Sequence, residues 1–201
     1  VDNIVNGEVT IDSIKHVDVE DILGRDPVKP QEELLKQNIK EKNILVTGAG
    51  GSIGSELCRQ ILELSPKKLI LFENSEFNLY SIHQELSKSK KKADIIPKLA
   101  TVTNFHQINK VISENEINTI FHAAAYKHVP MVEMNVSEGV YNNVIGTYNV
   151  AKAAKDNNVE NMLLISTDKA VRPTNVMGAS KRFSELILQA FADEKTNTCF
   201  S

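Results

Sequence analysis

The chain has 201 residues, of which 41% are hydrophobic and 24% charged, and these values are ordinary for a globular protein. The formal net charge of −3 provides no basic field, which argues against a nucleic-acid-binding protein. The longest apolar stretches are far too short to span a bilayer. Two cysteines, Cys58 and Cys199, stand in no metal-ligand or redox spacing, so we expect a reduced, cytoplasmic setting.

Residues 1–42 are mostly polar and lack a clear hydrophobic period, and Pro27 and Pro30 interrupt them. We interpret this segment as a linker or N-terminal arm, with a short helix around residues 31–37. The chain begins at Val1 rather than Met and carries no signal-peptide pattern. We therefore expect it to be a piece of a longer protein.

From Asn43 onward, short apolar runs alternate with stretches that repeat hydrophobic residues at helical spacing. The apolar runs predict strands at residues 44–46, 69–72, 95–102, 119–123 and 162–166, and the opening of a sixth strand at 198–201. The third of these strands is interrupted or ended near Pro97. The helical spacing predicts helices over residues 53–64, 77–86, 105–112, 140–154 and 183–191. This alternation predicts an α/β, doubly wound parallel sheet of the Rossmann type over residues 43–201.

A glycine-rich turn joins the first predicted strand to the first predicted helix, with the spacing G-x-x-G-x-x-G. Backbone N–H groups at the positive end of a helix bind a pyrophosphate, and side chains there would block its approach. We expect Gly48 to allow the tight turn, Gly51 the close approach and Gly54 the packing of helix on strand. The turn is not a P-loop, because no lysine follows its last glycine. The residues expected to bind the phosphates are Gly48, Gly51, Ser52, Ile53 and Gly54.

Glu73 ends the second predicted strand, about 20 residues after Gly54. An acidic residue at this place in a dinucleotide-binding unit binds the ribose 2′-hydroxyl. A carboxylate would repel a 2′-phosphate, so Glu73 favours NAD over NADP as cofactor. The alternative is a solvated charge at the end of a strand.

Three motifs together resemble those of the extended short-chain dehydrogenases. They are Thr-Gly-Ala-Gly-Gly-Ser-Ile-Gly at 47–54, His-Ala-Ala-Ala-Tyr-Lys-His-Val-Pro at 122–130 and Ser-Thr-Asp-Lys at 166–169. More narrowly, the chain from about Asp21 to its end is similar to the bacterial UDP-N-acetylglucosamine 4,6-dehydratases of polysaccharide and protein-glycan synthesis. The resemblance implies an NAD domain followed by a sugar-nucleotide domain that is largely absent from this chain.

In the long members of this family, membrane helices and another domain precede the dehydratase region. The resemblance therefore implies that the full-length protein is anchored at the cytoplasmic face of the inner membrane. It also implies a UDP-sugar as the substrate, and we expect a homo-oligomer.

The implied reaction is that of an NAD-dependent hydro-lyase. Hydride leaves sugar C4, the C5 proton and the C6 hydroxyl are lost as water, and hydride returns to C6. By resemblance, Asp168 would protonate the leaving hydroxyl and Lys169 would remove the C5 proton. A lysine base must be largely neutral, which requires burial or a nearby positive charge to lower its pKa. Neighbouring residues on a straight strand point to opposite faces, so both side chains reach one sugar only if the chain bends there.

Short-chain dehydrogenases usually carry Tyr-x-x-x-Lys on the next helix, and here Met177 stands at the tyrosine position and Lys181 at the lysine position. Methionine cannot carry a proton. The proton of the C4 hydroxyl therefore needs another acceptor, and Asp168, relayed through Thr167, is our candidate. Lys181 would still hold the nicotinamide ribose, while Met177 either contacts the substrate or packs within the protein.

Further candidates lie around the fourth predicted strand. Ala123 and Ala124 end this strand, where small residues let the cofactor lie close, although helix–sheet packing would also favour them. Lys127 either contacts substrate or cofactor oxygens or is a solvated loop lysine. We interpret His128 as structural, and Asn143 as either a residue that organises the site or an exposed one. The histidines share no ligand spacing, so no metal is predicted.

Two other functions remain open. A sugar-nucleotide 4-epimerase shares the oxidation at C4 but needs no acid–base pair for C5 and C6, so Asp168 and Lys169 argue against it. A non-catalytic NAD-binding sensor or scaffold is favoured by Met177. We expect the 201-residue chain by itself to be inactive or nearly so, because it holds half of a site that must close around a sugar nucleotide.

Overall fold

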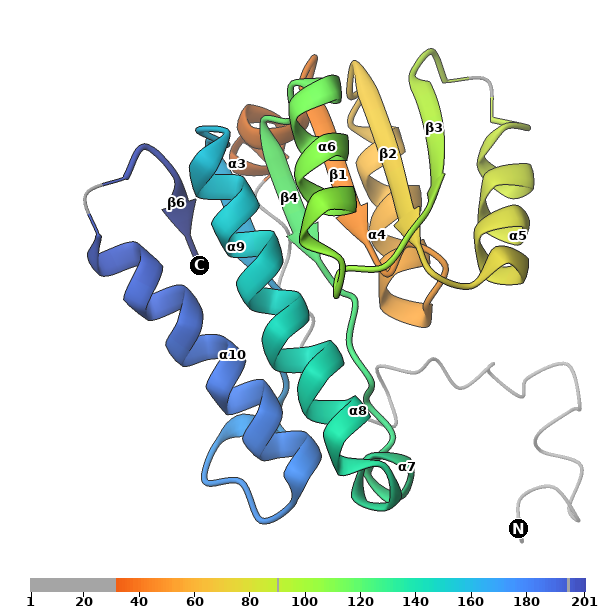
Figure 1. Ribbon diagram of the computed structural model, residues 1–201. Helices are drawn as coiled ribbons and strands as arrows, with labels where there is room; N and C mark the ends of the chain where they lie inside the picture. Colours follow the sequence, from red (N-terminus) through yellow and green to blue (C-terminus); the bar gives the residue numbers. More distant parts are fainter. Residues whose placement is uncertain (1–31, 90, 195) are drawn as a thin grey trace, which may run out of the picture. The chain divides into compact units, whose positions relative to one another are not determined.

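The computed structural model describes residues 32–89, 91–194 and 196–201 (Figure 1). Residues 33–201 form one compact unit. Most of the predicted arm, residues 1–31, lies outside the described residues. Within the described part of the chain, no helix is both long and apolar enough to cross a membrane.

The described chain builds one parallel sheet of six strands in the order β3-β2-β1-β4-β5-β6. The strands are β1 (Asn43–Thr47), β2 (Lys68–Glu73), β3 (Asp94–Leu99), β4 (Thr119–His122), β5 (Asn161–Leu164) and β6 (Cys199–Phe200). The order reverses between β1 and β4, which makes the carboxyl ends of these two strands the switch point where open α/β sheets bind ligands. The predicted doubly wound fold is confirmed.

Helices cover both faces of the sheet. One face packs against α3 (Glu32–Ile39), α4 (Ser52–Glu63) and α5 (Glu76–Leu86), and the other against α6 (Phe105–Asn115), α9 (Gly146–Asp156) and α10 (Val176–Asp193). The cause is the alternation of side chains along each strand: Ile44 and Val46 enter the first core, whereas Leu45 enters the second. In Figure 1, α6 lies in front of the strands and α4 behind them.

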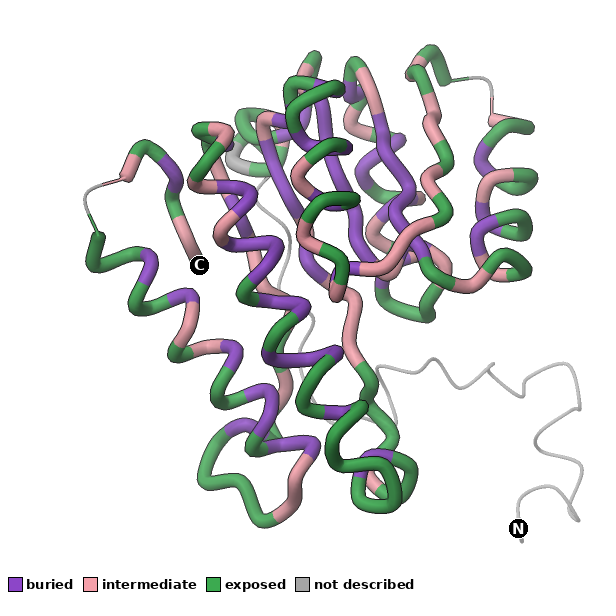
Figure 2. The backbone as a smooth tube through the Cα atoms, in the orientation of Figure 1, coloured by how far each residue is buried: buried purple, intermediate pink, exposed green. Residues whose placement is uncertain are grey.

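The central strands are buried on both faces, whereas β3 is an edge strand. Figure 2 shows buried residues along all of β1 and along β2 after its first residue, while β3 has only exposed and intermediate residues. Strand β3 is not interrupted at Pro97, which pairs with Leu71, but it ends soon afterwards at Leu99, before the predicted end at residue 102. Proline has no N–H to donate and is tolerated at an edge, where the free side of the strand has no partner.

The helical segment before β5 is more complex than predicted. Instead of one helix over residues 140–154, the chain forms α7 (Val129–Met134), α8 (Val136–Val140), a π-helical turn η2 (Tyr141–Ile145) and α9. The carbonyl of Asn143 in η2 accepts hydrogen bonds from Thr147 Oγ1 at 2.6 Å and from Ser184 Oγ at 2.8 Å. Single π-helical turns of this kind often mark functional sites.

The last part of the predicted arm belongs to the compact unit. The short helix predicted around residues 31–37 is α3, and Ile39 at its end is 3% exposed and packs in the same core as Ile44. Thr119 Oγ1 at the start of β4 donates to the carbonyl of Asn38 at 3.0 Å. Helix α3 therefore packs on the sheet together with the residues that follow it.

Candidate functional site

The turn between β1 and α4 requires glycine at its first position. Gly48 has φ +67°, a backbone conformation that residues with a Cβ rarely adopt. A Cβ at this residue would also lie 2.8 Å from the backbone N and Cα of Ala124. The predicted tight turn is confirmed, and its packing against the end of β4 leaves no room for a side chain.

The third glycine packs more closely still. A Cβ at Gly54 would lie 2.0 Å from the carbonyl oxygen of Gly48, so the contact that excludes a side chain is with the turn rather than with a strand. Gly51 is the N-cap of α4 and offers no side-chain cap. The first amides of a helix lack intrahelical acceptors, so the start of α4 can bind an anion through its backbone.

Glu73 lies beside the glycine turn and is 7% exposed. Its Oε2 accepts from the backbone N–H of Gly50 at 3.0 Å, and its Oε1 accepts from the N–H groups of Asn74 and Ser75 at 2.9 and 3.0 Å. The carboxylate therefore ties the glycine turn to the turn after β2. Its burial and its backbone partners exclude the solvated charge that the sequence left open.

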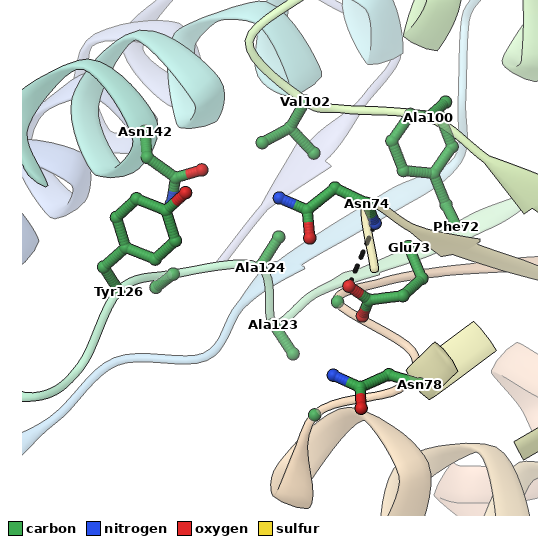
Figure 3. Close-up of a pocket in the computed structure, with 13 residues that line it drawn as sticks. Phe72, Glu73, Asn74, Asn78, Ala100, Val102, Ala123, Ala124, Tyr126 and Asn142 are labelled. Atoms are coloured by element: carbon green, nitrogen blue, oxygen red, sulfur yellow. Dashed lines mark hydrogen bonds between the residues drawn. The ribbon is translucent and has the colours of Figure 1, made fainter. Parts of the chain in front are cut away.

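A cavity of about 150 Å³ opens next to this carboxylate. Figure 3 shows Glu73 and Asn74 on one side of the cavity and Tyr126 and Asn142 on the other. Its lining is Gly48, Gly51, Phe72, Glu73, Asn74, Asn78, Ala100, Val102, Ala123, Ala124, Ala125, Tyr126 and Asn142. The predicted alanines at the end of β4 therefore face the space beside the glycine turn.

A second cavity of about 450 Å³ adjoins the first, and the two share Gly51, Ala123, Ala125 and Tyr126 in their linings. The other lining residues are Ser52, Ile53, Gly54, Lys127, His128, Met131, Val132, Ile165, Ser166, Thr167, Lys169, Met177 and Lys181. The fold thus brings all three sequence motifs to one trough at the carboxyl ends of β1, β4 and β5. His128, interpreted as structural, is exposed and lines this trough.

The chain bends directly after Thr167, as the acid–base pair requires. Residues Asp168–Ala170 form a 3₁₀ turn, η3. Thr167 Oγ1 donates to Asp168 Oδ1 at 2.9 Å, and Lys169 Nζ lies 3.5 Å from the same oxygen. The Thr167 hydroxyl and the Lys169 ammonium hold the pKa of the Asp168 carboxyl below its usual value.

The two members of the pair differ in position. Thr167 and Lys169 line the larger cavity, whereas Asp168 lies beside it with a side chain 88% exposed. The burial that a lysine base needs is not found in this chain, because the Lys169 side chain is 52% exposed and pairs with a carboxylate. The described residues therefore do not enclose the pair.

Lys181 and Met177 lie one helical turn apart on α10, and both are buried. Lys181 Nζ donates to the carbonyl of Ile165 at 2.7 Å. Burial lowers the pKa of Lys181 to about 8, while the nearby Glu185 carboxylate opposes this shift. Met177 packs within the protein at 3% exposure and also lines the larger cavity.

The buried His122 links the sheet to the helices. In the sequence this residue is only part of the motif at 122–130, and no role was predicted for it. His122 Nδ1 lies 2.6 Å from Thr47 Oγ1, and Nε2 lies 3.0 Å from Thr147 Oγ1. Since the Thr147 hydroxyl donates to the carbonyl of Asn143, it accepts from Nε2–H, and Nδ1 accepts from Thr47. Burial, followed by the charge of Lys181, lowers the pKa of His122 to about 3.

Asn143 is buried and organises the loop after β4, and it is not the exposed polar residue that the sequence left as an alternative. Its Oδ1 accepts from the N–H of Tyr126 at 2.8 Å, and its Nδ2 donates to the carbonyl of Tyr126 and to Ser180 Oγ, both at 3.0 Å. It is 1% exposed. One side chain on η2 therefore fixes the loop that carries Lys127 relative to α10. Among the described residues, no group of His, Cys, Asp and Glu side chains is arranged to hold a metal ion.

Several curated relatives of this chain are named as proteins of polysaccharide biosynthesis or as sugar-nucleotide enzymes. The capsular polysaccharide biosynthesis protein CapD of Staphylococcus aureus is 46% identical over 201 residues, which are 100% of this chain and 34% of CapD. A UDP-glucose 4-epimerase of Rickettsia rickettsii is 35% identical over 76% of this chain and 44% of its own length. An inverting UDP-N-acetylglucosamine 4,6-dehydratase of Campylobacter jejuni is 31% identical over 74% of this chain and 43% of its own length.

Solved structures share the fold. Pen from Bacillus thuringiensis superposes with a TM-score of 0.75 at 31% identity, over 81% of this chain and 49% of Pen. A double mutant of DesIV, the dTDP-glucose 4,6-dehydratase of Streptomyces venezuelae, with NAD bound, gives a TM-score of 0.69 at 21% identity, over 76% of this chain and 52% of DesIV. The chain spans about half or less of the length of these proteins. Residues 44–201 match the model of the polysaccharide biosynthesis protein family, and the chain therefore belongs to that family.

Proposed function

We propose that this chain is the NAD-binding part of a UDP-N-acetylglucosamine 4,6-dehydratase, a hydro-lyase that forms a 4-keto-6-deoxy sugar nucleotide. The observation that carries the proposal is the larger cavity, which Thr167, Lys169 and the buried Lys181 line together with the glycine turn. The relative from Campylobacter jejuni that is named as a dehydratase supports it.

We infer that NAD lies along the two cavities. The support is the Cβ-free turn at Gly48 and Gly54, the start of α4 and the carboxylate of Glu73, which suit a pyrophosphate and a ribose 2′-hydroxyl. Ala123 and Ala124 would let the dinucleotide lie close to β4. Bound NAD⁺ would supply the acceptor for hydride from C4 and its return to C6.

In the proposed reaction, Asp168 handles one proton twice. Its lowered pKa keeps the carboxyl ionised before the reaction, so that it can accept the proton of the C4 hydroxyl through Thr167. Asp168 then donates this proton to the C6 hydroxyl, which leaves as water. Lys169 takes the C5 proton, its ammonium group exchanges protons with the solvent, and it delivers a proton to C5 when hydride adds to C6. The sugar loses one water in total, and one hydrogen moves from C4 to C6.

The remaining residues of the larger cavity have binding roles in this proposal. Lys181 holds the nicotinamide ribose, Met177 contacts the sugar and Lys127 contacts substrate oxygens. A bound sugar nucleotide and the second domain would remove water from Lys169, and burial lowers the pKa of a lysine. This is the reason why the chain alone should be inactive.

The test uses the whole protein that contains this chain, incubated with UDP-N-acetylglucosamine in D₂O and followed by mass spectrometry. A dehydratase gives a product that has lost one water and gained one deuterium at C5. Lys169→Ala should lower kcat at least about 100-fold. The matched control Lys152→Ala, on the outer side of α9, should keep wild-type kcat. Full activity of Lys169→Ala would remove Lys169 from the mechanism.

Two other functions give different outcomes in the same experiment. The epimerase from Rickettsia rickettsii favours a 4-epimerase, which would give a product of unchanged mass without deuterium. Met177 at the tyrosine position favours a sensor or scaffold, which would bind NAD and turn over no sugar nucleotide.

We also propose that the whole protein is a homo-oligomer. The support is a set of exposed apolar side chains on helices that contact each other: Tyr141, Ile145 and Tyr148 along η2 and α9, and Phe183 and Leu186 on α10. Sets of this kind on neighbouring helices mark protein–protein contacts. An anchor at the cytoplasmic face of the inner membrane rests on the family resemblance, and fractionation of cells that express the whole protein would test it.

A further inference from the structure

A carboxylate on α7 holds the start of α10. Glu133 Oε1 accepts a hydrogen bond from the backbone N–H of Val176, the first residue of α10, at 2.6 Å. The N-cap residue Asn175 accepts from the N–H of Gly178 at 2.8 Å. One local and one distant side chain therefore satisfy amides of the first turn, and a negative charge is favourable at this positive end of the helix. In Figure 1, α7 lies beside this end of α10.

The two segments that Glu133 joins supply different parts of the lining of the larger cavity. His128, Met131 and Val132 come from α7 and its N-cap, whereas Met177 and Lys181 come from α10. The relative position of α7 and α10 therefore decides how these side chains face each other across the cavity.

Close backbone packing extends this connection to η3. A Cβ at Gly178 would lie 2.3 Å from the carbonyl oxygen of Lys169, so the first turn of α10 and η3 are in direct contact. Helix α7 also packs closely on α8, because a Cβ at Gly139 in α8 would lie 2.6 Å from Val132 Cγ1 in α7. Glu133 thus links α7, which packs closely on α8, to the first turn of α10, which contacts the backbone of Lys169.

We propose that Glu133 is a positioning residue that, through Val176 and the first turn of α10, fixes Lys169 and Lys181 relative to the α7 side of the cavity. It touches neither the dinucleotide cavity nor the reacting groups, and it acts through backbone placement alone. Small displacements of reacting groups cost large factors in rate. The kinetic part of this inference rests on the proposed function, whereas the structural part does not.

The test compares Glu133→Ala, which removes the acceptor, with Glu133→Gln, which keeps an acceptor oxygen without the charge. Glu138→Ala is the matched control, because it removes an exposed carboxylate from the neighbouring α8. In the whole protein, Glu133→Ala should lower kcat about tenfold and leave NAD affinity within about twofold. Glu133→Gln should recover most of this loss, and Glu138→Ala should match the wild type.

Hydrogen exchange of the same proteins measures the connection without any turnover. In Glu133→Ala, amides of residues 168–181 should exchange about tenfold faster, while those of β1 stay unchanged. Unchanged exchange in 168–181, faster exchange that includes β1, or a Glu133→Gln variant as impaired as Glu133→Ala would each overturn the proposal. If the wild type turns over no UDP-N-acetylglucosamine, the proposed function fails, and the exchange result still decides the role of Glu133.

Discussion

Replacement of His122 by glutamine tests the buried network beneath the site. The imidazole is 1% exposed, and burial lowers its pKa to about 3. A histidine in the unfolded chain has a pKa of about 6.5. Below that pH the unfolded state binds a proton that the folded state rejects, so stability is fully present above about pH 6.5 and is lost as the pH falls toward about 3. At about pH 5, this linkage removes about 2 kcal/mol from the free energy of unfolding.

The assay is urea unfolding followed by circular dichroism, at about pH 7.5 and about pH 5. Glutamine can donate to Thr147 and accept from Thr47 but does not titrate. The wild type should therefore lose about 2 kcal/mol more than His122→Gln between these two pH values. His106→Gln, which changes an exposed histidine on α6, is the matched control and should keep the wild-type pH dependence.

Equal losses in the wild type and His122→Gln would refute this reasoning. A second measurement guards against a variant that fails to fold: the NMR signal of the His122 ring in the wild-type chain should not titrate between about pH 7.5 and 5. A titration of this signal near about pH 6.5 would show that the ring is solvated and that the described network is wrong.

Gly54→Ala would place a Cβ 2.0 Å from the carbonyl oxygen of Gly48; it should cost about 2 kcal/mol of unfolding free energy in a urea titration, and a neutral result would contradict the described turn. Glu73→Gln in the whole protein should narrow the preference for NAD over NADP about tenfold by calorimetry, because it removes the charge that repels a 2′-phosphate. Thr147→Val leaves an imidazole N–H unpaired and should cost about 1–3 kcal/mol by calorimetric unfolding. Tyr148→Glu should dissociate the proposed oligomer in light scattering, and an unchanged mass would place the interface elsewhere.

The sequence patterns predict most of the fold. Apolar runs at the strands and helical spacing between them predict the parallel sheet, because strands buried on both faces must be apolar throughout. The glycine spacing predicts the turn after β1, since only glycine combines the positive φ of Gly48 with the close approach of Ala124. Helix α7 and the π-helical turn were not predicted, because short elements without a full hydrophobic period leave no pattern to read.

What the sequence by itself determined were the local features: the glycine turn, the acidic residue after β2 and the identity of each motif. Tertiary structure alone decided which side chains meet. The partners of His122 lie in β1 and α9, and Glu133 finds its partner at the start of α10. The physical reason is that hydrogen bonds between distant segments depend on how the helices pack on the sheet. Such contacts have no characteristic spacing in the sequence, whereas helices and strands do.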